Sequence, residues 1–171
     1  MKKVIILLLT AVFLISCEDS QTPITITTSY TLDESFDLEI GQIAGTQATY
    51  TETNTQDLSQ LITNYNDVDG VSLNTLTYEI TNFSGDTSGM VESGTISVNN
   101  IVIATISNLN PSQASTNTTI FEINDPSIVS QIENILETTP VLNLEATVTI
   151  PSSAPMTFSI EIHLGVDVTF N

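Results

Sequence analysis

Catalysis by a histidine in this chain would have to use His163, because it is the one histidine among 171 residues. An imidazole can act as a general base or as a metal ligand, and both roles need partner side chains. The alternation of its strand places His163 on the polar face, beside Glu161 and Gly165, and no Ser or Cys nucleophile is near it in sequence. The nucleophile motif Gly-x-Ser-x-Gly does not occur. We therefore interpret His163 as a solvated residue of an outer sheet face. A Ser-His-Asp site built from the many hydroxyls stays open.

The 20 aspartates and glutamates offer a second chemistry, because two carboxylates can serve as acid and base in glycoside cleavage. The sequence singles out no pair among them. Sugar sites also use aromatic platforms, and the chain has four tyrosines and no tryptophan. Tyr65 and Tyr78 fit core-facing patterns, which leaves Tyr30 and Tyr50. A carboxylate-dependent hydrolase is therefore the least favoured function class.

Calcium is the cofactor that best suits these residues, since it prefers hard oxygen ligands. The candidate ligands lie at two polar turns: Asp67 and Asp69 at one, Asp33 and Asp37 at the other. Counting Gly70 as position six of an EF-hand loop places Tyr65 at position one and Leu76 at position twelve, so the EF-hand pattern fails. Acids in turns commonly bond to local backbone, and we favour that interpretation over a calcium site.

Cys17 ends the N-terminal leader of the chain. Lys2 and Lys3 precede an apolar run from Val4 to Ile15 that is interrupted only by Thr10. A basic start, an apolar stretch and a small residue before a cleavage point indicate a secretory signal peptide. The run is shorter than the roughly 20 residues that a membrane-spanning helix needs.

The leader ends in Leu14-Ile15-Ser16-Cys17, which resembles the lipobox of bacterial lipoproteins. The resemblance implies a diacylglycerol thioether on Cys17, cleavage before it and an acyl chain, such as palmitate, on the new amine. Residues 1–16 would be removed, residues 17–23 would be the lipidated cysteine and an acidic tether, and residues 24–171 would form one domain. Because two or more acyl chains anchor stably, we expect a cell-envelope protein held to a membrane, and specifically an outer-membrane lipoprotein that is periplasmic or surface-exposed.

Charge and cysteine content limit the partners and the internal bonds that this chain can have. Both basic residues, Lys2 and Lys3, lie in the leader, so the processed chain would carry 20 acids, no Lys or Arg and a net charge of −20. Nucleic acid is excluded as a partner, because binding a phosphate backbone requires cationic side chains. We also expect no salt bridge inside the domain. Cys17 is the only cysteine, so an internal disulfide is excluded as well.

Nine segments have strand character. They lie at residues 24–28, 36–40, 47–53, 71–83, 96–98, 101–106, 118–123, 142–150 and 156–170. We expect Asp33 and Glu34 to turn the chain between the first two, a β-bulge near Asn74-Thr75, and a turn at Asn99-Asn100. The last two segments should form a C-terminal hairpin. The final segment should bend at Gly165, where it could switch sheets or twist sharply.

Two helices are predicted. The spacing of Leu58, Leu61, Ile62 and Tyr65 predicts one of about three turns. A second should start at Asp125 as its N-cap, with an apolar stripe facing the core and an end before Pro140. The polar residues 108–117 should form a loop.

These patterns predict a mainly β fold. It should be an antiparallel two-sheet sandwich, immunoglobulin-like in style, with two short helices in crossovers. For function we favour a non-enzymatic binding or structural module of the envelope with an unknown protein or glycan partner. A glycan- or ligand-capturing accessory lipoprotein is the alternative, followed by the carboxylate hydrolase.

Overall fold

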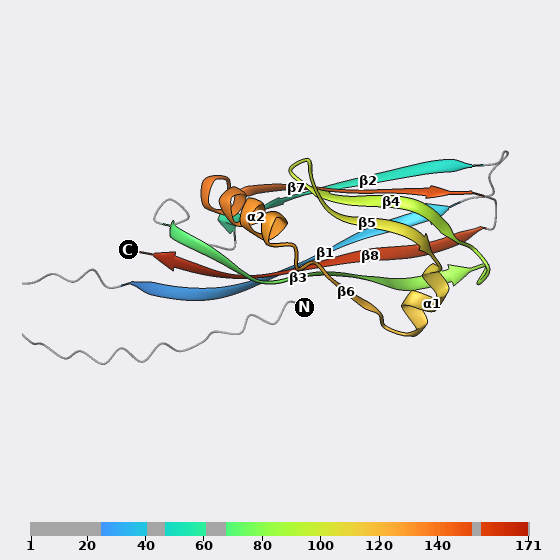
Figure 1. The fold of residues 1–171 in the computed structure, drawn as a ribbon, viewed down its shortest axis with the longest axis horizontal. Coiled ribbons are helices and arrows are strands. Elements are labelled where there is room, and N and C mark those ends of the chain that lie inside the picture. Colours follow the sequence, from blue (N-terminus) through green and yellow to red (C-terminus); the bar gives the residue numbers. More distant parts are fainter. Residues whose placement is uncertain (1–24, 41–46, 61–67, 152–154, 171) are drawn as a thin grey trace, which may run out of the picture.

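The described residues form two four-stranded sheets that pack face to face (Figure 1). The computed structural model describes residues 25–40, 47–60, 68–151 and 155–170. Every strand pair in it is antiparallel. The predicted mainly β sandwich is therefore confirmed. The leader with Cys17, the tether, Asp67 and most of the first predicted helix lie outside the described residues. No helix within the described ranges is long and apolar enough to cross a membrane.

Sheet A has the order β1-β8-β3-β6 and sheet B the order β2-β7-β4-β5. The strands of sheet A are β1 (Ile26–Ile40), β8 (Met156–Phe170), β3 (Val68–Gly85) and β6 (Ile120–Glu122). The strands of sheet B are β2 (Ala48–Asp57), β7 (Val141–Ile150), β4 (Val91–Val98) and β5 (Ile101–Leu109). The helices are a 3₁₀ turn η1 (Leu58–Gln60), α1 (Pro111–Thr116) and α2 (Pro126–Thr138).

β8 is the centre of sheet A because it pairs along nearly its whole length with β1 on one side and β3 on the other. Its even-numbered residues point between the sheets, and Ile160 and Val168 are fully buried there. The facing strand β7 buries its own even positions, such as Leu142 and Val148. Both strands follow the predicted period of two, which sends every second side chain of β8 to the outer face.

β1 corrects one sequence prediction. It is one strand of 15 residues, so the turn expected at Asp33 and Glu34 does not exist. The even positions continue the buried face through this point, and Glu34 lies on that face as a half-buried carboxylate. Its Oε2 accepts a hydrogen bond of 2.6 Å from Nδ2 of Asn54 on β2. The polar residue is satisfied across the sandwich, so it does not interrupt the strand.

The expected C-terminal hairpin is also wrong, because β7 and β8 belong to different sheets. The connection between Ile150 and Met156 crosses from sheet B to sheet A. β8 stays in one sheet through Gly165, so the predicted sheet switch there does not occur. The local irregularity lies opposite, where β3 shifts register between Leu73 and Thr75, which confirms the predicted bulge.

The short connections divide between confirmed and corrected predictions. Asn99 and Asn100 both have positive φ, as a tight hairpin turn between β4 and β5 requires. The segment expected as a loop contains helix α1, in which the N–H of Gln113 donates a hydrogen bond of 2.9 Å to the side-chain oxygen of Asn110. Helices α1 and α2 both lie in connections that cross between the sheets, so two short helices in crossovers are present as predicted. Only α2 is one of the two helices that the residue spacing predicted, because α1 replaces the expected loop.

Helix α2 begins as predicted, with Asp125 accepting hydrogen bonds from the backbone N–H groups of Ser127 and Ile128. Ile132 and Leu136 point from the helix into the core and are buried. An apolar stripe on the helix thus covers one end of the sandwich (Figure 1).

Two carboxylates of helix α2 accept hydrogen bonds from the backbone of strand β3. Oε1 of Glu133 accepts a hydrogen bond of 2.9 Å from the N–H of Leu73, and Oε1 of Glu137 accepts one of 3.2 Å from the N–H of Val71. β6 pairs with only three residues of β3, further along the strand. The helix therefore binds donors on a strand edge that could otherwise pair with another chain.

Candidate functional site

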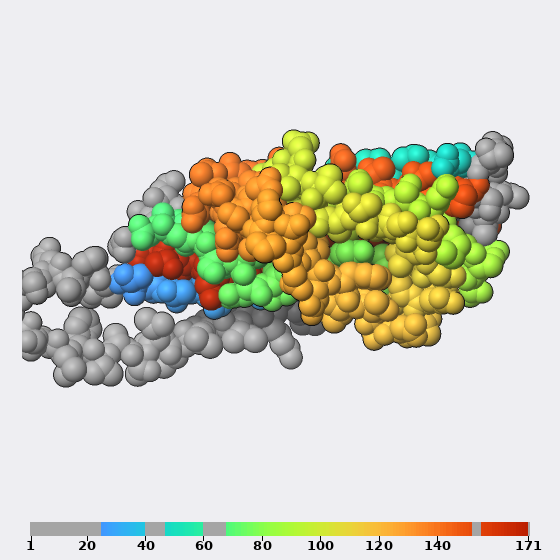
Figure 2. All heavy atoms as spheres, viewed as in Figure 1, coloured from blue at the N-terminus to red at the C-terminus, as the bar shows by residue number. Residues whose placement is uncertain are grey.

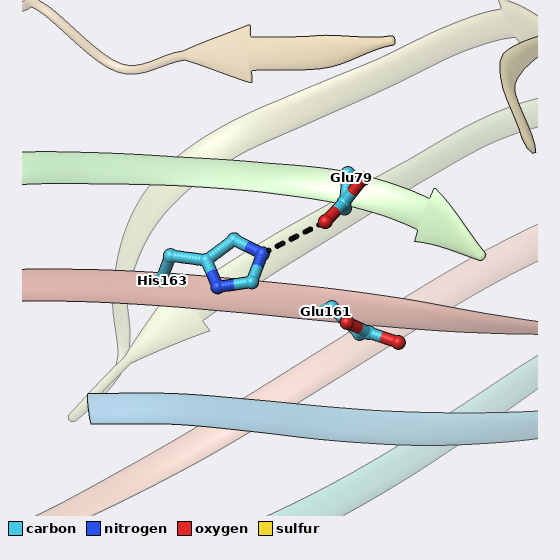
Figure 3. A group of neighbouring side chains, drawn as sticks. All are labelled: Glu79, Glu161 and His163. Carbon is cyan, nitrogen blue, oxygen red and sulfur yellow. Dashed lines mark hydrogen bonds and ion pairs between the residues drawn. The ribbon is translucent and has the colours of Figure 1, made fainter. Parts of the chain in front are cut away.

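The outer face of sheet A brings an imidazole together with three carboxylates. His163 lies on β8, Asp33 beside it on β1, and Glu79 on β3; Glu161 precedes His163 by two residues on the same face of β8. We call these four residues the acid–imidazole cluster. Figure 3 shows Glu79, Glu161 and His163 on neighbouring strands, with the His163 ring directed at Glu79. Antiparallel pairing at fixed register creates this group, because β8 places its odd-numbered side chains between those of two neighbouring strands.

Both ring nitrogens of His163 contact carboxylates. Nδ1 lies 2.7 Å from Oδ1 of Asp33, and Nε2 lies 3.1 Å from Oε1 of Glu79. The side chain of His163 is 27% exposed and that of Glu79 is 22% exposed, so water reaches these groups only partly. The prediction of an outer-face position is confirmed, whereas the interpretation of His163 as a solvated histidine without partners is wrong.

These two contacts limit the protonation states that suit His163. A neutral imidazole donates from only one nitrogen. If Nδ1 donates to Asp33, an unprotonated Nε2 and a carboxylate oxygen of Glu79 would face each other as two acceptors. A second proton or another cation between these atoms removes the conflict.

The net pKa of His163 reflects opposing effects. Partial burial lowers it, but the hydrogen bonds and negative charges of Asp33 and Glu79 together outweigh burial and raise the pKa above its ordinary value of 6.5. When His163 is protonated, both contacts are ion pairs. The expectation that the domain contains no salt bridge is therefore wrong below this pKa.

Glu161 stands directly opposite Glu79 in the strand register. Like charges at such positions repel each other. Oε1 of Glu161 accepts a hydrogen bond of 2.5 Å from Oγ1 of Thr81, which orients its carboxylate. One ligand atom each from Glu79, Glu161 and His163 can be chosen so that all three lie within 4.8 Å of one another.

The four calcium candidates do not come together. Asp33 contacts His163, whereas Asp37 lies further along β1 and accepts a hydrogen bond of 2.6 Å from the hydroxyl of Ser159. Asp69 is exposed on β3, and Asp67 is outside the described residues. Among the described residues, the one group of three or more metal-ligating side chains is that of Glu79, Glu161 and His163, and it contains none of the four.

Other polar residues extend this face along sheet A. Oδ1 of Asp167 accepts a hydrogen bond of 2.5 Å from the hydroxyl of Ser29, and hydrogen bonds from Ser29 and Asn74 lower the pKa of Asp167. Asn82 donates to the buried hydroxyl of Ser159 at 3.2 Å. The outward residues of β1 are exposed from Thr27 to Glu39. The face is thus a continuous polar surface with the acid–imidazole cluster near its middle.

A groove lies between β5 and β6, at the edge of the sandwich opposite β1 and β2. It has a volume of about 530 Å³, and in Figure 2 it opens between the yellow atoms of β5 and the orange atoms around β6, with green β3 atoms at its base. The rings of Tyr78 and Phe121 stack there at a centroid distance of 4.6 Å. Tyr78 is buried, as predicted, and its burial raises the pKa of its hydroxyl.

Asp33 and Glu79 are the residues of the site that sequence reasoning missed as partners of His163. The sequence pattern favours a turn at Asp33, and Glu79 lies 84 residues from His163. Strand parity could have placed both on the outer face. Their adjacency to His163 depends on which strands pair and in what register, which the sequence pattern did not fix.

The comparisons with known proteins add no further assignment. No protein-family model matches the chain, and searches of the curated proteins and of the solved structures find no match either.

Proposed function

We propose that this chain is a lipid-anchored protein of the bacterial cell envelope whose β-sandwich is a non-enzymatic binding or structural module. Its location rests on the lipobox-like sequence ending at Cys17, and the envelope site would be the outer membrane, with the domain in the periplasm or at the cell surface. The observation that supports a binding role is the polar outer face of sheet A, whose β1 residues are exposed over almost the whole strand.

The geometry of sheet A suits presentation away from a membrane. The first described strand begins at Ile26, nine residues after the proposed anchor, opposite Phe170 at the end of β8. From there to Asp33, seven residues of strand cover about 23 Å. The acid–imidazole cluster would therefore stand clear of the bilayer, where a partner in solution or on a neighbouring surface can reach it.

Mass spectrometry of the protein purified from bacterial membranes tests the anchor. We expect the N-terminal peptide to begin at Cys17 and to carry a diacylglycerol thioether and an N-acyl chain. A Cys17→Ser variant should lose both the added mass and membrane association. An intact Met1, or an unmodified thiol at Cys17 in the membrane-purified protein, would overturn the proposed location.

Proteolysis of whole cells distinguishes the two orientations of the domain. Trypsin cannot be used, because Lys2 and Lys3 are the only trypsin sites in the chain. A protease of broad specificity should degrade a surface-exposed domain in intact cells and should degrade a periplasmic one only after the outer membrane is opened. Purified protein is digested in parallel as a control. Its degradation shows that a domain that survives in intact cells is shielded by the outer membrane and is not itself resistant to the protease.

The groove between β5 and β6 supports a second candidate function, which is capture of a glycan fragment. Its stacked pair of aromatic rings and its polar margin, which includes Glu122 and Asn124, combine a flat apolar surface with hydrogen-bonding groups. A glycan array should then give binding that a Phe121→Ala variant loses. Equal binding by this variant, or no binding to any glycan, would contradict this role.

A carboxylate-dependent hydrolase has less support. Glu79 and Glu161 are the closest candidates for an acid and base pair, because they face each other across β3 and β8. They lie on an outer sheet face and do not line the groove between β5 and β6, whereas glycoside cleavage needs a substrate held between two carboxylates. Turnover of chromogenic glycosides that is lost in a Glu161→Gln variant would restore this alternative.

A further inference from the structure

The acid–imidazole cluster offers three ligands, two carboxylates and one imidazole, that together suit a transition metal. Glu79 and Glu161 each provide a carboxylate oxygen and His163 provides Nε2, from two adjacent strands, and these atoms lie within 4.8 Å of one another. In a tetrahedral zinc site with bonds of about 2.0–2.2 Å, neighbouring ligand atoms are about 3.4 Å apart. Nε2 of His163 and Oε1 of Glu79 are already 3.1 Å apart. The half-buried Glu161 carboxylate supplies the third ligand atom within the 4.8 Å limit of the group.

The surroundings of the three ligands orient them as a metal site requires. Asp33 binds Nδ1 of His163 at 2.7 Å, and this contact fixes the ring so that Nε2 faces Glu79. Histidine ligands of metals almost always donate their other nitrogen to such a carboxylate or carbonyl. Thr81 holds Glu161 from the opposite side. Asp33 and Thr81 are thus positioning residues and not ligands.

The contact between Nε2 of His163 and Oε1 of Glu79 can accommodate a metal cation in place of the second ring proton. Nε2 of His163 and a carboxylate oxygen of Glu79 are both acceptors when the ring is neutral, and a metal ion between them would bind both lone pairs. Glu161 adds a second negative charge directly opposite Glu79. The described residues include no Lys or Arg that could neutralise these acids in place of a metal.

We propose that Glu79, Glu161 and His163 bind one divalent transition-metal ion, with zinc as the best fit, on the outer face of sheet A. An imidazole nitrogen with two carboxylates favours zinc and its neighbours in the first transition row over calcium or magnesium, which prefer all-oxygen sites. Three protein ligands leave at least one coordination position for water or for a donor from a partner. This inference rests on the binding role proposed for the polar face, and it names a ligand for that face.

Isothermal titration with zinc tests the site, using the full chain purified in a nonionic detergent after removal of metals with EDTA. We expect saturable binding of one zinc ion per chain. The His163→Gln and Glu161→Gln variants should bind at least about tenfold more weakly, and Asp33→Ala should weaken binding about 10- to 100-fold by releasing the ring. An equal concentration of calcium should not displace zinc.

Glu122→Gln is the matched control. It removes the same charge from β6, one strand beyond Glu79 in the same sheet, and Glu122 supplies no atom to the group. Its zinc affinity should equal that of the unmodified chain. Glu161→Gln should retain the acceptor for Thr81 and lose a like-charge contact, so its melting temperature without metal should be no lower than that of the unmodified chain. A loss of zinc binding in this variant therefore cannot come from unfolding.

Three results would overturn the metal site. They are the absence of saturable zinc binding, an equal weakening by Glu122→Gln, which would indicate diffuse attraction to acids, and displacement of zinc by equimolar calcium. A free thiol at Cys17 is itself a zinc ligand, so the titration is repeated with Cys17→Ser. Binding that persists in this variant assigns zinc to sheet A whatever the state of Cys17. Failure of the anchor and failure of the metal site are therefore separate outcomes.

Discussion

His163 has a carboxylate at each ring nitrogen, and this arrangement determines how the outer face of sheet A responds to pH. The groups that face its ring are Asp33 on β1, Thr77 and Glu79 on β3, and Glu161 on its own strand. None of them is cationic. Protonation of the ring therefore lets both nitrogens donate and makes both contacts ion pairs, with no opposing positive charge nearby.

Replacing His163 with Gln should reduce stability at low pH and much less at high pH. The folded pKa of His163 is raised above 6.5, so its ion pairs contribute fully below that ordinary value and are lost as pH rises through the raised folded value. Partly exposed ion pairs contribute little, so we expect a difference of about 0.5–1 kcal/mol between pH 5.5 and pH 9. Urea unfolding in EDTA-containing buffer measures it.

The absence of any other histidine makes this pH dependence assignable. Asp37→Asn, which changes a carboxylate of the same face that does not contact the ring, is the control and should keep the pH dependence of the unmodified chain. A difference between the His163→Gln variant and the unmodified chain that is constant from pH 5.5 to pH 9 would show that the two contacts do not act as ion pairs.

The side-chain contacts between strands were the part of the site that the sequence predicted least well. The outer position of His163 followed from strand parity, as did the burial of Tyr78. The assignment of Asp33 to a turn failed because a polar pair within an alternating segment was interpreted as an interruption. Its neighbour Glu34 is instead satisfied by Asn54 on the other sheet, a contact between strands that no local pattern predicts.

At the scale of the elements, helix α2 has two structural roles, packing on the core and binding the edge of β3. The sequence predicts the first role but not the second. Its N-cap at Asp125 and its apolar stripe are local features, and both were predicted. Its use of Glu133 and Glu137 to bind backbone N–H groups of β3 depends on where the helix docks. These two acids are therefore part of the protection of a strand edge.

Asp125→Ala should destabilise the domain by about 0.5–2 kcal/mol, because it removes the side chain that accepts hydrogen bonds from the N–H groups of Ser127 and Ile128. The free energy of unfolding in urea measures the loss. Asp125→Asn is the matched variant, since an amide oxygen can still cap the helix, and it should stay close to the unmodified chain. Equal losses in the two variants would assign the effect to charge and not to capping.

Over the described residues the protein combines a continuous apolar core with a surface that has carboxylates and no Lys or Arg. The buried residues of both sheets form one cluster, which also includes Ala114 of α1 and Ile132 of α2. Repulsion among 20 carboxylates opposes compaction, and apolar burial together with backbone hydrogen bonding must exceed it. The fold therefore depends on its core more than a domain with mixed charges does.

Salt should stabilise this protein. Raising sodium chloride from about 10 mM to about 300 mM shortens the screening length from about 30 Å to about 6 Å, which weakens repulsion between carboxylates across the surface. We expect the melting temperature at pH 8 to rise over this range, and potassium chloride to give the same result. A melting temperature that falls with salt would show that attractive ion contacts outweigh the repulsion.

By itself the sequence determined the properties that depend on local pattern or on composition. Alternation over β7 and β8 gave the buried faces, Asp125 gave the start of α2, and Asn99 and Asn100 gave a hairpin turn. The confinement of both basic residues to Lys2 and Lys3 gives the expectation that nucleic acid is not a partner, which stays a prediction. Each of these features depends on residues close together in the sequence or on residue counts, so the sequence alone is sufficient to predict it.

The tertiary structure alone decided which strands are neighbours. β7 and β8 are consecutive in sequence yet lie in different sheets, while β8 pairs with β1 and β3 across separations of up to 144 residues. Side-chain alternation specifies which way a residue faces but not the strand beside it, because every amphipathic strand presents the same backbone donors and acceptors to any partner. The meeting of Asp33, Glu79 and His163 is a consequence of strand order and register, and so it was settled only when the two sheets packed.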